Sequence, residues 1–177
     1  SGFEADDIIG SLAKQHEKHV DVVIVTGDMD ELQLVSEHTT VYTMRKGFTD
    51  TVEYDEKAVK EKYGVTPSEF IVYKALKGDT SDNIPGVSGV GDKTATDLVS
   101  KYHSLDNIYK HLDELSPSVA KKMEAGKKEA YLSEDLATIK TDMNLKFDLK
   151  DAVVHEYDRK KVYDLFHELG FKSLFAK

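Results

Sequence analysis

Seven carboxylates in three short clusters are the residues of this chain best suited to chemistry. They are Glu4, Asp6 and Asp7, then Asp28 and Asp30, and finally Asp79 and Asp82. Carboxylates at this density repel one another unless a cation lies between them. A set of oxygen ligands without histidine or cysteine favours Mg²⁺ or Mn²⁺ over zinc. Two such ions about 4 Å apart stabilise the attacking and leaving oxygens of a displacement at phosphorus, so the clusters predict phosphodiester chemistry.

Each acidic cluster also has a simpler explanation when it is taken alone. The first complements the positive end of a helix, the second suits a solvated turn, and the third can cap a helix. All three clusters, however, lie at the ends of predicted elements. Their coincidence favours one shared metal site over three unrelated local roles.

A glycine-rich stretch that follows the third cluster has the form of a helix–hairpin–helix motif. Its glycines allow a phosphate strand to approach exposed backbone N–H groups, and Val87 and Val90 would anchor the hairpin in a small core. Such a motif binds duplex backbone without reading sequence. A tight loop between two packed helices is the alternative. The residues predicted to contact DNA are Gly86, Val87, Ser88, Gly89, Val90, Gly91, Lys93 and Thr94.

The first part of the chain has the pattern of an α/β fold. The apolar run 22–25 predicts a strand buried on both faces of a parallel sheet, between a helix over 4–18 and a short helix over 31–35. Asp28 and Asp30 follow that strand at its carboxyl end, where open α/β sheets bind ligands. A second strand over 40–44 should form an antiparallel hairpin with residues 50–54.

The second part of the chain is predicted to be helical. A capping box at residues 66–69 begins a helix that Gly78 ends. The later helices are expected over 92–101, 105–112, 117–139 with a weak point at Gly126, and 158–169 with Gly170 and Phe171 closing the end. We therefore expect an α/β domain over residues 1–76 and a helical subdomain over 77–177.

Composition limits the remaining classes of protein. The 177 residues include no cysteine, which excludes disulfides, thiolate zinc sites and cysteine nucleophiles. No apolar run approaches the roughly 20 residues that span a bilayer, so we expect no membrane partner. The net charge of −9 argues little against DNA binding, because metal ions would neutralise the acidic clusters. A lysine-rich stretch is interpreted as a solvated helix face, and its members are Lys121, Lys122, Lys127 and Lys128.

Residues 2–10, 26–34 and 76–91 together resemble the 5′-nuclease domains of bacterial DNA polymerase I, which are relatives of the flap endonucleases. The resemblance covers the full chain. It implies a parallel-sheet core of the PIN-like type, in which the seven carboxylates hold two Mg²⁺ or Mn²⁺ ions. It also implies that the hairpin holds duplex DNA, with a potassium ion on its backbone carbonyls.

The same resemblance implies a 5′-3′ exonuclease and flap endonuclease that acts on DNA with 5′ flaps, nicks or RNA primers in replication and repair. A covalently attached polymerase domain, a bacterial cytoplasmic location and a monomeric state are expected with it. Further acids of the family and a basic arch would lie upstream of Ser1. We therefore expect a core that is incomplete at its N-terminus and cleaves weakly as an isolated piece. Two alternatives stay open: a non-catalytic duplex-DNA-binding module, and a PIN-type ribonuclease, which typically lacks the hairpin.

Overall fold

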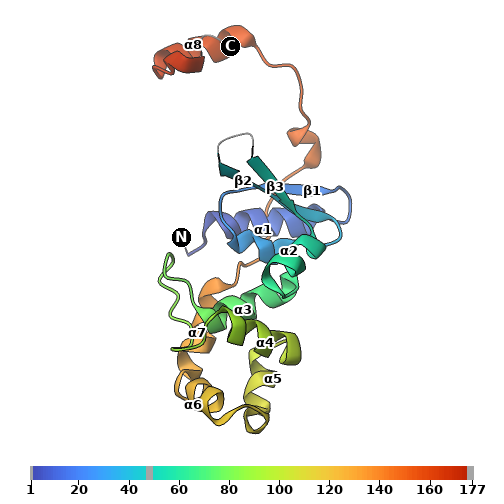
Figure 1. Ribbon diagram of the computed structural model, residues 1–177. Helices are drawn as coiled ribbons and strands as arrows, with labels where there is room; N and C mark the ends of the chain where they lie inside the picture. The colour runs from blue at the N-terminus through green and yellow to red at the C-terminus, as the bar shows by residue number, and fades with distance from the viewer. Residues whose placement is uncertain (1, 47–49, 175–177) are drawn as a thin grey trace. The chain divides into compact units, whose positions relative to one another are not determined.

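The computed structural model describes residues 2–46 and 50–174, which form two compact units (Figure 1). The first unit is Ser1–Leu145 and the second is Lys146–Lys177. The boundary predicted between residues 76 and 77 lies inside the first unit, near the end of a helix, and stays a prediction. No described helix is both long enough and apolar enough to cross a membrane.

A three-stranded sheet forms the α/β part of the first unit, in the order β1 (Val22–Val25), β2 (Thr39–Lys46) and β3 (Asp50–Tyr54). β1 pairs parallel with β2, with Ile24 opposite Val41. β2 pairs antiparallel with β3, with Val41 opposite Tyr54. The predicted strands, the parallel pair and the antiparallel pair are therefore confirmed. The predicted turn between β2 and β3 includes residues 47–49, which lie outside the described residues.

The prediction that β1 is buried on both faces is wrong for this structure. Ile24 is only 5% exposed, whereas Val23 and Val25 are 56% and 66% exposed. β1 is an edge strand, and α1 (Ala5–His16) and η1 (Asp30–Leu34, a 3₁₀-helix) pack beside the sheet. No described element covers Val23 and Val25. An apolar run shows that a strand could be buried on both faces of a sheet. It does not show that helices cover both faces.

The helices around the sheet follow local signals. α1 begins after Glu4, whose backbone N–H donates to Asp7 Oδ2 at 3.0 Å. The sequence analysis missed α2 (Glu56–Tyr63), although both of its caps have ordinary signatures. Asp55 Oδ1 accepts the N–H of Ala58 at 2.7 Å, and Gly64 ends the helix with a φ of 74°.

α3 (Phe70–Lys77) connects the α/β part with the helices that follow it. The predicted capping box is confirmed, because the Thr66 N–H donates to Glu69 Oε2 at 2.8 Å. Its first turn is the 3₁₀-helix η2 (Pro67–Glu69). Gly78, with a φ of 78°, ends α3 as predicted. α3 packs against η1, α4 and α7, so it links the end of β1 to the helical part.

The remaining helices of the first unit confirm the predicted helical pattern, including the break at Gly126. They are α4 (Asp92–Tyr102), α5 (Leu105–Lys110), η3 (Leu112–Glu114), α6 (Pro117–Ala125) and α7 (Lys127–Ala137). After α7 the chain returns to α1. There the Lys140 N–H donates to Asp7 Oδ1 at 2.8 Å, and Ser11 Oγ donates to the Lys140 carbonyl at 3.1 Å.

The second unit contains η4 (Leu149–Ala152), α8 (Arg159–Glu168) and η5 (Lys172–Leu174). Asp158 caps α8 by accepting the N–H groups of Lys160 and Lys161. The predicted end of this helix is confirmed. Gly170 has a φ of 71°, and the ring of Phe171 lies 5.9 Å from that of Phe166.

Candidate metal centre and nucleic-acid interface

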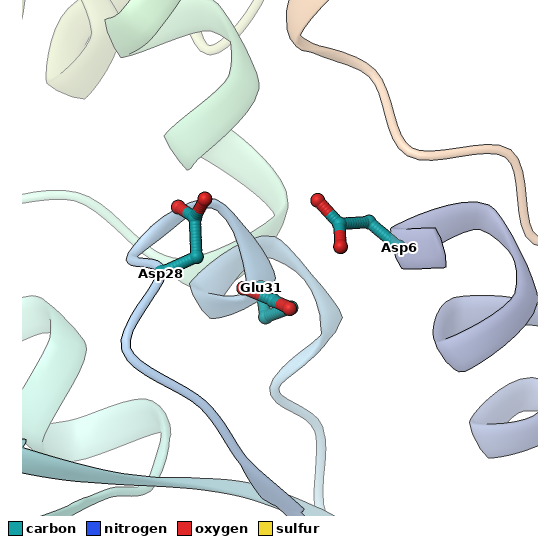
Figure 2. A group of neighbouring side chains, drawn as sticks. All are labelled: Asp6, Asp28 and Glu31. Atoms are coloured by element: carbon teal, nitrogen blue, oxygen red, sulfur yellow. The ribbon is translucent and has the colours of Figure 1, made fainter. Parts of the chain in front are cut away.

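Three carboxylates converge beside the carboxyl end of β1. Asp6 comes from the first turn of α1, Asp28 from the loop after β1, and Glu31 from η1. One oxygen from each lies within 4.8 Å of the others. Figure 2 shows Asp6 and Asp28 approaching from opposite sides, with Glu31 between them in the view. The loop is shaped by its own side chains, because the Asp28 N–H donates to Thr26 Oγ1 at 3.0 Å.

This first cluster carries uncompensated negative charge. Burial and the nearby charge of Asp6 raise the pKa of Glu31 to about 6. Burial and the charge of Asp28 also raise the pKa of Asp6. Glu31 Oε2 is buried and has no hydrogen-bond partner among the described residues. Hard oxygen donors with an unsatisfied buried atom fit a divalent cation such as Mg²⁺ or Mn²⁺.

A second cluster is formed by Asp30, Asp79 and Asp82, again with one oxygen of each within 4.8 Å of the others. A lysine ammonium lies among these carboxylates. Lys74 Nζ contacts Asp30 Oδ1 directly, and it lies 3.1 Å from Asp79 Oδ2 and 3.7 Å from Asp82 Oδ2. This side chain is only 6% exposed. An internal cation therefore compensates the second cluster.

The pKa values of the second cluster reflect this pairing. Burial opposes the charged form of Lys74, but its contacts with Asp30 and Asp79 raise its pKa above the usual value. Burial raises the pKa of Asp30 despite the opposing effect of Lys74. The Ser81 hydroxyl is the main reason why the pKa of Asp79 falls to about 2. Asp79 is thus held ionised, and Lys74 is held protonated.

Glu4 and Asp7 lie outside both clusters. Glu4 is exposed, and it lines a cavity of about 220 Å³ together with Asp6, Asp7 and Asp30. Both oxygens of Asp7 accept backbone N–H groups, from Glu4 at 3.0 Å and from Lys140 at 2.8 Å. These two bonds lower the pKa of Asp7. Asp7 therefore ties α1 to the returning chain, and a metal role for Glu4 and Asp7 stays a prediction.

The sequence analysis did not assign Glu31 or Lys74 to the site. Glu31 directly follows Asp30, so it could be taken as one more acid of a solvated turn. Lys74 has a clearer signal, because it is a lone charge within a helix whose neighbours Tyr73 and Ala75 are apolar and buried. A charged residue at such a position requires a partner.

The hairpin is held from inside the fold by three of its backbone N–H groups. Gly86 donates to Ser133 Oγ at 2.9 Å, Val87 to the Leu76 carbonyl at 2.8 Å, and Val90 to the Val87 carbonyl at 2.9 Å. The side chains of Val87 and Val90 are 2% and 5% exposed, which confirms their predicted place in a core.

Two other N–H groups of the hairpin belong to exposed glycines and form no internal hydrogen bond among the described residues. These glycines are Gly89 and Gly91. The first turn of α4 follows directly and carries Lys93, which is also exposed. Free N–H groups beside a helix N-terminus and a lysine are the elements of a phosphate-binding surface. Contact of residues 86–91, Lys93 and Thr94 with DNA stays a prediction.

One lysine of the lysine-rich stretch, Lys122 of α6, contacts this hairpin. Lys122 Nζ donates to the Gly89 carbonyl at 2.8 Å, so its ammonium group lies on the exposed side of the turn. Lys121 and Lys122 line a groove with Pro85, Gly86 and Ser88. Lys121 and Lys122 are exposed, as expected of a solvated helix face, and Lys122 in addition contacts the hairpin.

Carboxylates gathered at the end of a parallel strand, together with a hairpin whose glycines leave backbone N–H groups free, are features expected of the class of metal-dependent nucleic-acid hydrolases. Comparison with known families agrees with this class. Residues 1–64 match the 5′-3′ exonuclease N-terminal resolvase-like domain, and residues 65–160 match the 5′-3′ exonuclease C-terminal SAM fold. The chain belongs to the 5′-3′ exonuclease family.

Individual relatives are consistent with this family. The chain is 45% identical to DNA polymerase I of Caldicellulosiruptor bescii, over 99% of this chain and 21% of that protein. It is 44% identical to DNA polymerase I of Bacillus subtilis, over 99% of this chain and 20% of that protein. The chain thus spans about a fifth of the length of these relatives. A structure of T5 5′-exonuclease with divalent metal ions (zinc) bound matches with a TM-score of 0.67 and 25% identity, over 79% of this chain and 51% of that one.

Proposed function

We propose that this chain is part of a metal-dependent 5′-3′ exonuclease and flap endonuclease that hydrolyses phosphodiester bonds in DNA. One observation carries the proposal: the half-buried Asp6 and the exposed Asp28 converge from separate elements on the buried Glu31, at a negative site that no described cation compensates. Membership of the 5′-3′ exonuclease family supports the same reaction. We infer that the substrates are DNA with 5′ flaps, nicks or RNA primers.

The metal is proposed to be Mg²⁺ or Mn²⁺, in two sites. A divalent ion supplies charge stabilisation at phosphorus and lowers the pKa of a bound water. The first cluster provides Asp6 and Asp28 as its ligands. In the second cluster, Lys74 holds Asp30, Asp79 and Asp82 together before any ion arrives. Ion binding there would compete with the ammonium group of Lys74.

The hairpin is proposed to hold the duplex while the carboxylate site acts on the strand. The free N–H groups of Gly89 and Gly91 would bind one phosphate, and Lys93 would add positive charge. The potassium ion implied by the family resemblance remains part of the proposal. Since Lys122 already donates to the Gly89 carbonyl, the potassium ion would bind other carbonyls or displace this ammonium group.

The partners of the chain are proposals of the same kind. The named relatives are DNA polymerase I, so we propose that the chain works beside a covalently attached polymerase domain. We further propose that the protein is a monomer in the bacterial cytoplasm and associates with the nucleoid when it acts on DNA. The division into an α/β domain over residues 1–76 and a helical subdomain over 77–177 is also proposed, with Asp79 and Asp82 of the second part contributing to the metal site beside Asp30.

Cleavage of a 5′-labelled flap substrate by the full-length gene product tests the function. Asp28→Asn should lower the Mg²⁺-dependent rate at least about a hundredfold, because loss even of outer-shell groups costs 10–100-fold. Flap binding should be retained. Asp113→Asn, which changes an exposed aspartate in η3, is the matched control. Equal rates for wild type and Asp28→Asn would refute the proposal. Binding without any cleavage would favour a duplex-binding module, and cleavage of RNA alone would favour a PIN-type ribonuclease.

A further inference from the structure

Glu31 is a buried glutamate whose charge the fold leaves unsatisfied. Its exposed fraction is 2%. Its Oε1 accepts one weak hydrogen bond from Thr26 Oγ1 at 3.3 Å, and its Oε2 has no hydrogen-bond partner among the described residues. Burying a carboxylate without a hydrogen-bond partner or a cation is unfavourable, because the charged group loses its hydration. A structural role alone does not explain this arrangement.

Glu17 shows how the same fold treats a buried glutamate with a structural role. Its exposed fraction is 9%, and Lys14 Nζ lies 2.5 Å from its Oε1. Its Oε2 accepts hydrogen bonds from Ser36 Oγ at 2.8 Å and from Thr39 Oγ1 at 3.3 Å. Both carboxylate oxygens of Glu17 therefore have partners within the chain, whereas Glu31 Oε2 has none among the described residues.

The local helix type explains how two adjacent acids serve different clusters. A 3₁₀-helix has three residues per turn, so successive side chains in η1 point about 120° apart. Asp30 thereby contacts Lys74 in the second cluster, while Glu31 joins Asp6 and Asp28 in the first. The ammonium group of Lys74 is thus committed to the other cluster. No described lysine or arginine forms an ion pair with Glu31.

We propose that Glu31 supplies a third carboxylate oxygen, beside Asp6 and Asp28, to one divalent cation. The unpartnered Oε2 and the 4.8 Å convergence of the three carboxylates carry this assignment. The ligand class is a hard divalent cation, because the donors are oxygens only. This inference rests on the metal site of the proposed function and adds a residue to it.

Calorimetric titration of the protein with Mn²⁺ alone tests the assignment, with no DNA present. Glu31→Gln keeps the side-chain shape and should weaken Mn²⁺ binding at least about tenfold. Glu37→Gln, which changes an exposed glutamate in the segment between η1 and β2, should leave binding unchanged. Mn²⁺ affinity of Glu31→Gln equal to that of wild type would overturn the inference.

Thermal unfolding in EDTA gives a second readout. Since Glu31→Gln removes a charge without a partner, the variant should melt at or above the wild-type temperature, while Mn²⁺ should raise its melting temperature less. A clear loss of melting temperature in EDTA, or failure to fold, would show a structural role and overturn the inference. If wild-type protein binds no Mn²⁺, the metal site of the proposed function fails too. If wild type and Glu31→Gln bind it equally, only the role of Glu31 fails.

Discussion

Replacing Gly86 by alanine tests how the hairpin is held against α3. Gly86 has a φ of 62°, in the left-handed region. A Cβ atom there would lie 2.4 Å from the Gly78 nitrogen and 2.7 Å from the Lys77 carbonyl carbon. Both neighbours are backbone atoms, so no side-chain rotation relieves the overlap. The hairpin would have to move away from the end of α3.

The expected cost follows from the contacts that such a movement breaks. Left-handed backbone costs alanine about 1–2 kcal/mol. The displacement would also weaken the bonds from the Gly86 N–H to Ser133 Oγ and from the Val87 N–H to the Leu76 carbonyl. Each contributes about 1 kcal/mol. We therefore expect Gly86→Ala to lower the free energy of unfolding by about 3–4 kcal/mol and to weaken duplex binding.

Two other glycines of the hairpin provide matched controls. Gly89 has a φ of 78°, but its Cβ would meet only the flexible side chain of Lys122, at 3.1 Å or more. Gly89→Ala should cost about 1–2 kcal/mol from backbone strain alone. Gly91 has ordinary extended backbone and nothing within 4 Å, so Gly91→Ala should stay within about 0.5 kcal/mol of wild type. Urea unfolding measures all three variants, and equal stability of Gly86→Ala and Gly91→Ala would refute the reasoning.

Three further substitutions test the phosphate surface and the second cluster. Lys93→Ala should lower the salt slope of duplex binding by about 1 on any sequence, and an unchanged slope would count against a phosphate contact. The depressed pKa of Asp79 stabilises the fold above about pH 4, and this stability is lost as the pH falls toward about 2. Ser81→Ala should therefore cost about 1 kcal/mol in urea unfolding at pH 7 and little at pH 2, whereas an equal loss at both pH values would contradict this. Lys74→Met should lower stability in EDTA by about 3 kcal/mol, because three acids lose their cation, and Mg²⁺ should restore part of it. A loss that Mg²⁺ does not reduce would show that these acids do not accept a metal ion.

Much of the fold follows from local sequence signals. The capping box at Thr66, the break at Gly126 and the closure of α8 by Gly170 are each set by residues a few positions apart. The same signals were present for α2, in Asp55 and Gly64, and could have been used. Residues close in the sequence determine where these elements begin and end, so these boundaries can be predicted from the sequence.

Features that depend on distant segments could not be predicted in this way. The exposure of Val23 depends on whether another layer covers the sheet. The role of Asp7 depends on the N–H of Lys140, which arrives only after the whole helical part. The division of Asp30 and Glu31 between two clusters depends on the position of Lys74 on α3. The sequence predicted the acids as one group, but the clusters that they form and the partners that they contact are properties of the folded chain.

The most direct test of the central claim is the anomalous diffraction signal of crystals of this chain grown with Mn²⁺. The structure predicts a manganese peak between Asp6 and Asp28, within coordination distance of both carboxylates. The uncompensated charge there should make this site fill before the second cluster, where Lys74 competes. A peak only at surface acids, or no peak near Asp6 and Asp28 at saturating Mn²⁺, would contradict the account of this chain as a metal-dependent nuclease.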